Sequence, residues 1–127
     1  MSTENINIGE AELEIMKVVW KAGEPITSTE IGRIVESKGW KRTTIATFLS
    51  RLVEKGVLAA EKRGKSMYYT PLISSKEYKK SQVAGLIRNV FDGSARELVA
   101  HLFEGKNFSD DDIQELKSIF EDTDKAE

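Results

Sequence analysis

The sequence predicts a mainly α protein in which three helices and a β-hairpin are followed by three further helices. Three observations carry this prediction. Ser or Thr followed three residues later by Glu marks the first turn of a helix, because the two residues satisfy N–H groups that the helix leaves unbonded. Apolar residues three and four positions apart mark the buried side of a helix. Two short β-prone runs around a glycine mark a hairpin.

Three helix starts fit the first pattern, Gly9 with Glu12 and Ser109 with Asp112 are variants of it, and a sixth helix is marked by the second pattern. Thr27, with Glu three residues later, is a clear start, whereas Ser109, with Asp at that position, is a weaker one. Between residues 43 and 55 the apolar side chains recur with helical spacing, and Gly56 then ends the helix. The expected helices lie near residues 9–22, 27–38, 43–55, 75–91, 94–104 and 109–121.

The hairpin is predicted between the third and fourth helices. Its strands cover residues 57–62 and 66–70, with the turn at Arg63-Gly64-Lys65. Packed around one core, the first three helices and this hairpin form a winged helix-turn-helix. The expected core residues are Leu13, Met16, Trp20, Ile31, Ile34, Val35, Ile45, Leu49 and Leu52.

Composition excludes several classes of protein. The 127 residues provide about one domain's worth of core. No run approaches the ~20 apolar residues of a membrane helix, and the N-terminus lacks the basic start and apolar stretch of a signal peptide, so a cytoplasmic location is expected. The chain has no cysteine, and His101 is its only histidine. We therefore expect no metal centre, no cofactor and no enzymatic activity.

The net charge of −2 conceals an uneven distribution. Residues 1–37 carry a net charge of −4, residues 38–72 of +6 and residues 73–127 of −4. A basic block of this kind is either solvated surface or the footprint of a polyanion. The predicted fold favours the second interpretation, because the third helix of a winged helix-turn-helix can enter the major groove of DNA.

The third helix is expected to present small polar side chains to solvent, opposite its apolar stripe. Such side chains suit contacts with base edges, and the neighbouring Arg51 suits a phosphate or a guanine. Basic residues before the helix and at the hairpin tip surround the same surface. The candidate DNA-binding residues are Lys41, Arg42, Thr43, Ala46, Thr47, Ser50, Arg51, Arg63 and Lys65.

Residues 73–127 carry more apolar surface than a segment of that length can bury against itself. We expect a second copy, related by a two-fold axis, to cover it, so that residues 1–72 form the DNA-binding domain and 73–127 the dimerisation region. The alternative is that these helices fold back onto the chain's own winged helix. The candidate dimerisation residues are Tyr78, Leu86, Ile87, Val90, Phe91, Leu98, Leu102, Phe103, Ile113, Leu116 and Phe120.

Three stretches carry a family resemblance, namely GEAELEIMKVVW at 9–20, GWKRTTIATFLSRLVEKG at 39–56 and YYTP at 68–71. With these motifs at this spacing, the chain resembles the penicillinase-repressor family (BlaI/MecI), which includes a copper-responsive branch. The resemblance implies a dimeric repressor whose N-terminal winged helix binds a dyad-symmetric operator. It also implies that Trp40 lies at the DNA backbone and that Thr44 belongs to the recognition helix.

The resemblance further implies how repression is relieved. In the penicillinase repressors a membrane-bound sensor metalloprotease signals, and the repressor is cleaved within its dimerisation region. The matching bond here is His101-Leu102, where the family has a bond of the Asn-Phe type. Thr43 and Ala46 stand where penicillinase repressors often carry Lys and Gln, so the family's operator sequence is not transferred to this chain. The lack of cysteine excludes the copper route.

Two other functions are compatible with parts of the sequence. Winged helices also serve as protein adaptors, but the basic block favours DNA. The run Asp110-Asp111-Asp112 suggests Mg²⁺, yet consecutive helical residues diverge by about 100° and acids in a first turn complement the helix dipole. His101 is interpreted as a semi-exposed helix residue rather than a ligand or a switch.

Overall fold

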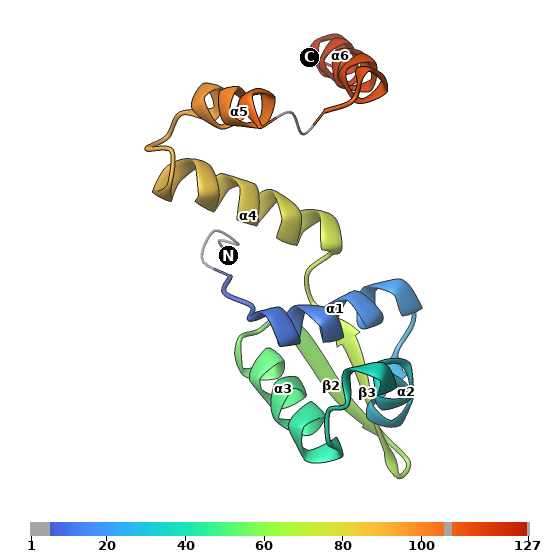
Figure 1. The fold of residues 1–127 in the computed structure, drawn as a ribbon. Helices are drawn as coiled ribbons and strands as arrows, with labels where there is room; N and C mark the ends of the chain where they lie inside the picture. The colour runs from blue at the N-terminus through green and yellow to red at the C-terminus, as the bar shows by residue number, and fades with distance from the viewer. Residues whose placement is uncertain (1–5, 106–107, 127) are drawn as a thin grey trace. The chain divides into compact units, whose positions relative to one another are not determined.

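A computed structural model gives the fold of residues 6–105 and 108–126, with side chains described as far as residue 119 (Figure 1). The predicted winged helix-turn-helix followed by three helices is confirmed. The elements are α1 (Glu10–Ala22), β1 (Ile26–Thr27), α2 (Ser28–Ile34), the 3-10 helix η1 (Glu36–Lys38), α3 (Arg42–Glu54), β2 (Leu58–Arg63), β3 (Ser66–Pro71), α4 (Ser75–Asn89), α5 (Ala95–Glu104) and α6 (Asp110–Ala126).

The chain forms two compact units, Met1–Ala84 and Gly85–Glu127. The first contains the winged helix and most of α4, and the second contains the end of α4 together with α5 and α6. The predicted functional division after residue 72 stays a prediction. In the part of the chain that the structure describes, no helix is long and apolar enough to cross a membrane.

The helix starts predicted from sequence are present as hydrogen-bonded caps. At Ser94 the hydroxyl accepts from the Glu97 N–H at 3.0 Å, while the Ser94 N–H donates to the carbonyl of Phe91. At the other Ser and Thr starts, the backbone N–H of each residue of the pair donates to the side-chain oxygen of the other, so the helix end is capped by residues three positions apart. These reciprocal pairs are Thr27 with Glu30, Ser74 with Glu77 and Ser109 with Asp112.

The sheet has one strand more than the sequence predicts. β1 pairs antiparallel with β3, with Ile26 opposite Tyr69 and Thr27 opposite Tyr68, in the strand order β1-β3-β2. Thr27 therefore belongs to the sheet and caps α2 at the same time. A strand of two residues is too short to show alternation in the sequence, so no pattern announces it.

The hairpin forms the predicted wing. β2 and β3 pair from Leu58 opposite Pro71 to Arg63 opposite Ser66, and Gly64 begins the two-residue loop with a φ of +63°. Glycine adopts this left-handed backbone without steric cost. The tip of the wing and the N-terminal end of α3 lie at the same end of the first unit (Figure 1).

The core of the first unit lies between α1, α2, α3 and the base of the wing. Most of the expected core residues are buried, and Ile15, Val19, Val57 and Leu58 complete the core. Ile34 was expected in the core, and this expectation is wrong, because its side chain is 60% exposed. α2 ends at this residue, and the next one, Val35, takes the inward position instead.

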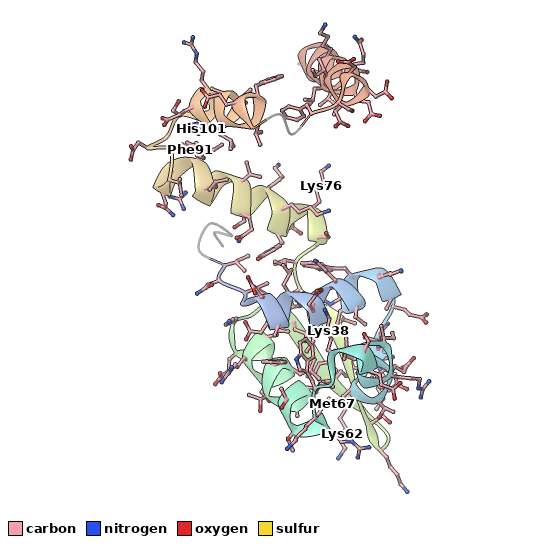
Figure 2. All side chains as sticks on the ribbon, viewed as in Figure 1. Lys38, Lys62, Met67, Lys76, Phe91 and His101 are labelled. Carbon is pink, nitrogen blue, oxygen red and sulfur yellow. The ribbon has the colours of Figure 1, made fainter. Side chains whose placement is uncertain are left out.

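The second unit is packed more loosely. Among its side chains described, none falls in the fully buried class, and the exposed ones include Leu86, Val90, Val99, Phe103 and Ile119. The rings of Phe91 and His101 lie 5.3 Å apart where α4 passes into α5 (Figure 2), and those of Phe103 and Phe108 lie 5.0 Å apart. These contacts join neighbouring helices but leave much apolar surface open to solvent.

Candidate nucleic-acid interface

α3 has two distinct sides, as the sequence predicts. Ile45, Leu49 and Leu52 are buried in the core. Thr44 is half-buried at the boundary of the two sides. The remaining candidate residues of the helix are exposed, and these are Thr43, Ala46, Thr47, Ser50 and Arg51. The helix therefore offers small polar groups and one guanidinium to a molecule outside the fold.

The hydroxyl of Thr47 is oriented by the helix itself. It donates to the carbonyl of Thr43 at 3.0 Å. Its oxygen lone pairs and its methyl group remain directed away from that bond. In this rotamer Thr47 can accept a hydrogen bond from an adenine or cytosine amino group, or contact a thymine methyl group.

The N-terminal end of α3 is basic and lacks a side-chain cap. Lys41 holds the N-cap position and Arg42 the first helical position, both exposed, and the first turn contains no acid. Cations at this end oppose the helix dipole, and the first N–H groups have no partner within the helix. An anion bound here would remove both unfavourable features.

A hollow of about 550 Å³ opens between α2 and α3. It joins three predicted residues, Trp40, Arg42 and Ala46, to residues that the sequence analysis missed. The missed residues are Ser28, Thr29 and Arg33 of α2. The acidic balance of residues 1–37 concealed them. The signal that could have identified them is the position of Ser28 and Thr29 in the first turn of α2, the helix that precedes α3.

Trp40 stands at the edge of this hollow. Its ring meets Phe48 edge-on, with centroids 5.3 Å apart and an interplanar angle of 74°. The indole is half-buried, and its N–H has no hydrogen-bond partner among residues 6–105 and 108–119. The ring is thus held in place by packing while its one polar group stays available.

The two basic residues of the wing differ in their surroundings. Arg63 Nε donates to Glu61 Oε1 at 2.7 Å, and its guanidinium lies 5.2 Å from the ring centre of Tyr68. The hydrogen bond to Glu61 raises the pKa of Arg63. Lys65, at the tip, is exposed and forms no ion pair with any residue described. Lys65 is therefore more accessible than Arg63. A further cation of the hairpin, Lys62, lies beside Met67 (Figure 2).

The candidate dimerisation residues do not share one environment. Tyr78 is only 8% exposed, with its ring 5.7 Å from that of Trp20, so it packs inside the first unit and the expectation of an intersubunit role does not fit its position. Leu86, Val90 and Phe103 are exposed. The side chain of Phe120 lies outside the described part. The half-buried members are Ile87, Phe91, Leu98, Leu102, Ile113 and Leu116.

The candidate cleavage bond lies inside α5. His101 is exposed, and its Nδ1 lies 2.9 Å from the carbonyl oxygen of Glu97. Leu102 is half-buried and lines an apolar hollow of about 190 Å³ between α5 and α6. A bond within a helix is accessible to a protease only after local unfolding.

These features define a class of protein. A winged helix that directs an exposed polar helix, an uncapped basic helix end and a basic wing tip outward is the architecture of a DNA-binding protein. Residues 8–122 match the penicillinase repressor family, and the chain belongs to that family. The resemblance found in the sequence is thereby confirmed, and the family is one of DNA-binding transcriptional repressors rather than of enzymes.

Individual relatives agree with this assignment. The chain is 33% identical over 115 residues to the penicillinase repressor of Bacillus licheniformis, covering 91% of this chain and 90% of that protein. It is 29% identical over 119 residues to the methicillin resistance regulatory protein MecI of Staphylococcus aureus, covering 94% and 97%. The solution structure of the DNA binding domain of the repressor BlaI matches 61% of this chain and 94% of that one, with 38% identity and a TM-score of 0.53.

Proposed function

We propose that this protein is a dimeric repressor that binds a dyad-symmetric operator through α3 and the wing. The observation that carries the proposal is the uncapped start of α3, where Lys41 and Arg42 stand against the helix dipole. A DNA phosphate placed there would bind both cations and the free N–H groups. The hollow between α2 and α3, with Arg33 at its edge, extends the same surface along the DNA backbone.

Sequence is read by the exposed side of α3. Thr43, Thr47 and Ser50 are one helical turn apart and carry hydroxyls short enough to approach base edges closely. Arg51 and Lys65 contact the backbone on either side of them, and Trp40 packs against the sugar-phosphate chain. Backbone contacts fix the register on the duplex, and base contacts supply the discrimination.

Dimerisation is supported by the exposed apolar side chains of the second unit. Surface of this kind is rare on a monomer unless it is an interface. A second copy, related by a two-fold axis, would cover it and place two recognition helices about one turn of DNA apart, or a multiple of it. The protein would act in the cytoplasm, where it would meet the DNA.

Regulation is proposed by analogy with the family. A membrane-bound sensor metalloprotease would act on the repressor directly or indirectly, and cleavage at His101-Leu102 would remove part of the dimerisation region. Because this bond lies in α5, local opening of that helix would have to precede cleavage.

The DNA-binding proposal is tested with the full-length chain and random duplexes from which binding sequences are selected. We expect the selected sites to be inverted repeats, and log K to fall linearly with log salt concentration with a slope of about −0.9 per phosphate contacted. Selection of no sequence, or of single half-sites only, would contradict the proposal.

The dimer is tested by sedimentation of Val90→Asp. Val90 is 62% exposed, so the new charge costs the folded monomer little but cannot be tolerated inside an apolar interface. Ile34→Asp is the matched control, because Ile34 is 60% exposed and lies in the first unit. We expect only the Val90 variant to become monomeric. A wild-type protein that sediments as a monomer, or equal behaviour of the two variants, would refute the dimer.

A further inference from the structure

Lys55 stands at the C-terminal end of the recognition helix and is bound to a carboxylate on α1. Its Nζ lies 2.5 Å from Oε1 of Glu12. The same oxygen accepts the backbone N–H of Gly9 at 2.9 Å. Glu12 is only 5% exposed, which makes it the most deeply buried acid in the described part of the chain. One buried oxygen thus joins the start of α1 to the end of α3.

This arrangement favours an ionised carboxylate. Burial raises the pKa of Glu12, but the hydrogen bonds from Lys55 and Gly9 and the positive charges of Lys55 and Arg51 outweigh it and bring the pKa below its ordinary value. A buried charge without such partners would be strongly unfavourable. The ionised state of the Glu12 carboxylate therefore depends on the hydrogen bond and the positive charge of Lys55.

Lys55 is not needed to end the helix. Gly56, with a φ of +77°, follows it, and the N–H groups of Gly56 and Val57 donate to the carbonyls of Val53 and Leu52 at 3.0 and 3.2 Å. These backbone bonds form a complete C-terminal cap. The ion pair consequently serves another purpose, namely the attachment of α3 to α1.

Because the ion pair lies at the C-terminal end of α3, a small change in the angle of the helix displaces its N-terminal end considerably. α3 has 13 residues. At 1.5 Å per residue it is about 20 Å long, so a tilt of about 5° at its C-terminal end moves its N-terminal end by about 1.7 Å. Recognition requires side chains to be placed within about 0.5 Å. Arg42 and Thr43 lie at the end that such a tilt would displace most.

We propose that Glu12 and Lys55 are positioning residues of the DNA-binding site: the buried pair fixes the angle of α3 on α1 and keeps Lys55 from acting as a phosphate contact. Arg51 lies one turn earlier and forms no ion pair with any residue in the described ranges. At this end of α3, Arg51 is therefore the cation available to contact DNA. The inference rests on the proposed function, because it concerns how α3 is presented to an operator.

The test measures binding of the full-length protein to its selected operator and to random duplex, at several salt concentrations and well below the unfolding temperature. Lys55→Met is expected to weaken operator binding by about tenfold, equivalent to about 1.4 kcal/mol. It should leave the salt slope and the affinity for random duplex close to those of the wild type. Lys55→Arg, which can keep the pair, is expected to bind like the wild type.

Glu12→Gln is the second variant, because it keeps the shape and the acceptor for Gly9 but removes the charge. It should weaken operator binding in the same direction, and the double variant Glu12→Gln with Lys55→Met should be no weaker than Lys55→Met alone. Glu14→Gln is the matched control, since Glu14 lies on the same helix and pairs with Lys17 and Lys38 at the surface. It should leave binding unchanged.

The outcomes separate the inference from the proposed function. Wild-type operator affinity in folded Lys55→Met and Glu12→Gln would overturn the inference alone. A salt slope reduced by about 0.9 in Lys55→Met would also overturn it, because that would make Lys55 a phosphate contact. If Lys55→Met is unfolded, the result for Glu12→Gln decides. Failure of the wild type to select any operator would instead refute the proposed function.

Discussion

The indole N–H of Trp20 donates to the backbone carbonyl of Ile73 at 2.9 Å, joining α1 to a segment 53 residues further along the chain. The ring of Tyr78 then packs on the same indole. Tyr78 and Ser81 are both buried, although they follow the wing. The first turns of α4 therefore contribute to the core of the first unit.

Replacement of Trp20 by Phe is expected to lower the free energy of unfolding by about 1 kcal/mol or more, because the Ile73 carbonyl loses its donor and the smaller ring leaves a gap beside Tyr78. Urea denaturation measures the loss. Trp40→Phe is the control, because the Trp40 indole N–H has no partner in the part of the molecule described. It should cost less stability but weaken operator binding. A larger loss of stability for Trp40→Phe would contradict this assignment.

The stability of a truncated protein should depend on where the chain is cut. A protein that ends after Ala84 is expected to retain a folded first unit, be monomeric and bind a full operator far more weakly, because the linked second half-site is lost. A protein that ends after Leu72 loses the partners of Trp20 and should unfold at a lower temperature. Thermal unfolding and sedimentation of both proteins check this, and equal unfolding temperatures would show that the start of α4 adds nothing.

On α3, Thr47→Ala is expected to weaken operator binding by roughly 1–3 kcal/mol while barely changing affinity for random duplex, because a base contact is lost. Arg51→Ala should weaken binding to both DNAs, since a backbone contact carries no sequence information. Competition titrations with the two duplexes measure the difference. Equal losses on both DNAs for Thr47→Ala would remove Thr47 from the residues that read bases.

In the wing, Lys65→Ala is expected to weaken DNA binding and to reduce the magnitude of the salt slope by about 0.9, the value for one phosphate contact. Glu61→Gln should instead strengthen DNA binding. The substitution weakens the hydrogen bond that holds Arg63 and removes a negative charge from the surface proposed to meet phosphate. Binding measured across salt concentrations with both variants tests this. Unchanged affinity for random duplex in Glu61→Gln would indicate that Arg63 remains turned away from DNA.

Acid should destabilise the wild type more than Glu12→Gln. The pKa of Glu12 in the folded protein is lowered from 4.5, so its ionised form stabilises the fold above that value, and this contribution is lost as the pH falls through the lower, folded-state pKa. The difference in unfolding free energy between the two proteins should be constant near neutral pH and shrink below about pH 4.5. A difference independent of pH would show that the pKa of Glu12 is the same in the folded and unfolded states.

The features predicted correctly from the sequence are those that neighbouring residues determine. The cap formed by Thr27 and Glu30 closes three residues of chain and needs no tertiary contact. The stripe of Ile45, Leu49 and Leu52 follows from helical period alone. These local signals were enough to predict α3 and the residues on its exposed side.

The features that sequence did not predict depend on distant partners. Tyr78 has the spacing of a dimer contact, but its ring meets Trp20, a pairing that no local pattern reveals. Ile34 fits the apolar period of α2, yet the helix ends there and the residue faces solvent. The role of Glu12 beyond its own helix start also required the three-dimensional position of Lys55.

The short pairing of β1 with β3 has a consequence for the thermodynamics of recognition. Ile26 and Thr27 pair with Tyr69 and Tyr68 of the wing, and Thr27 also caps α2, so the base of the wing is linked to α2 in the protein without DNA. Ordering a free hairpin on association would cost about 1–2 kcal/mol for each residue fixed. In this chain the ordering takes place during folding, so the proposed contacts of the wing with DNA would contribute to affinity without an entropic loss at the moment of binding.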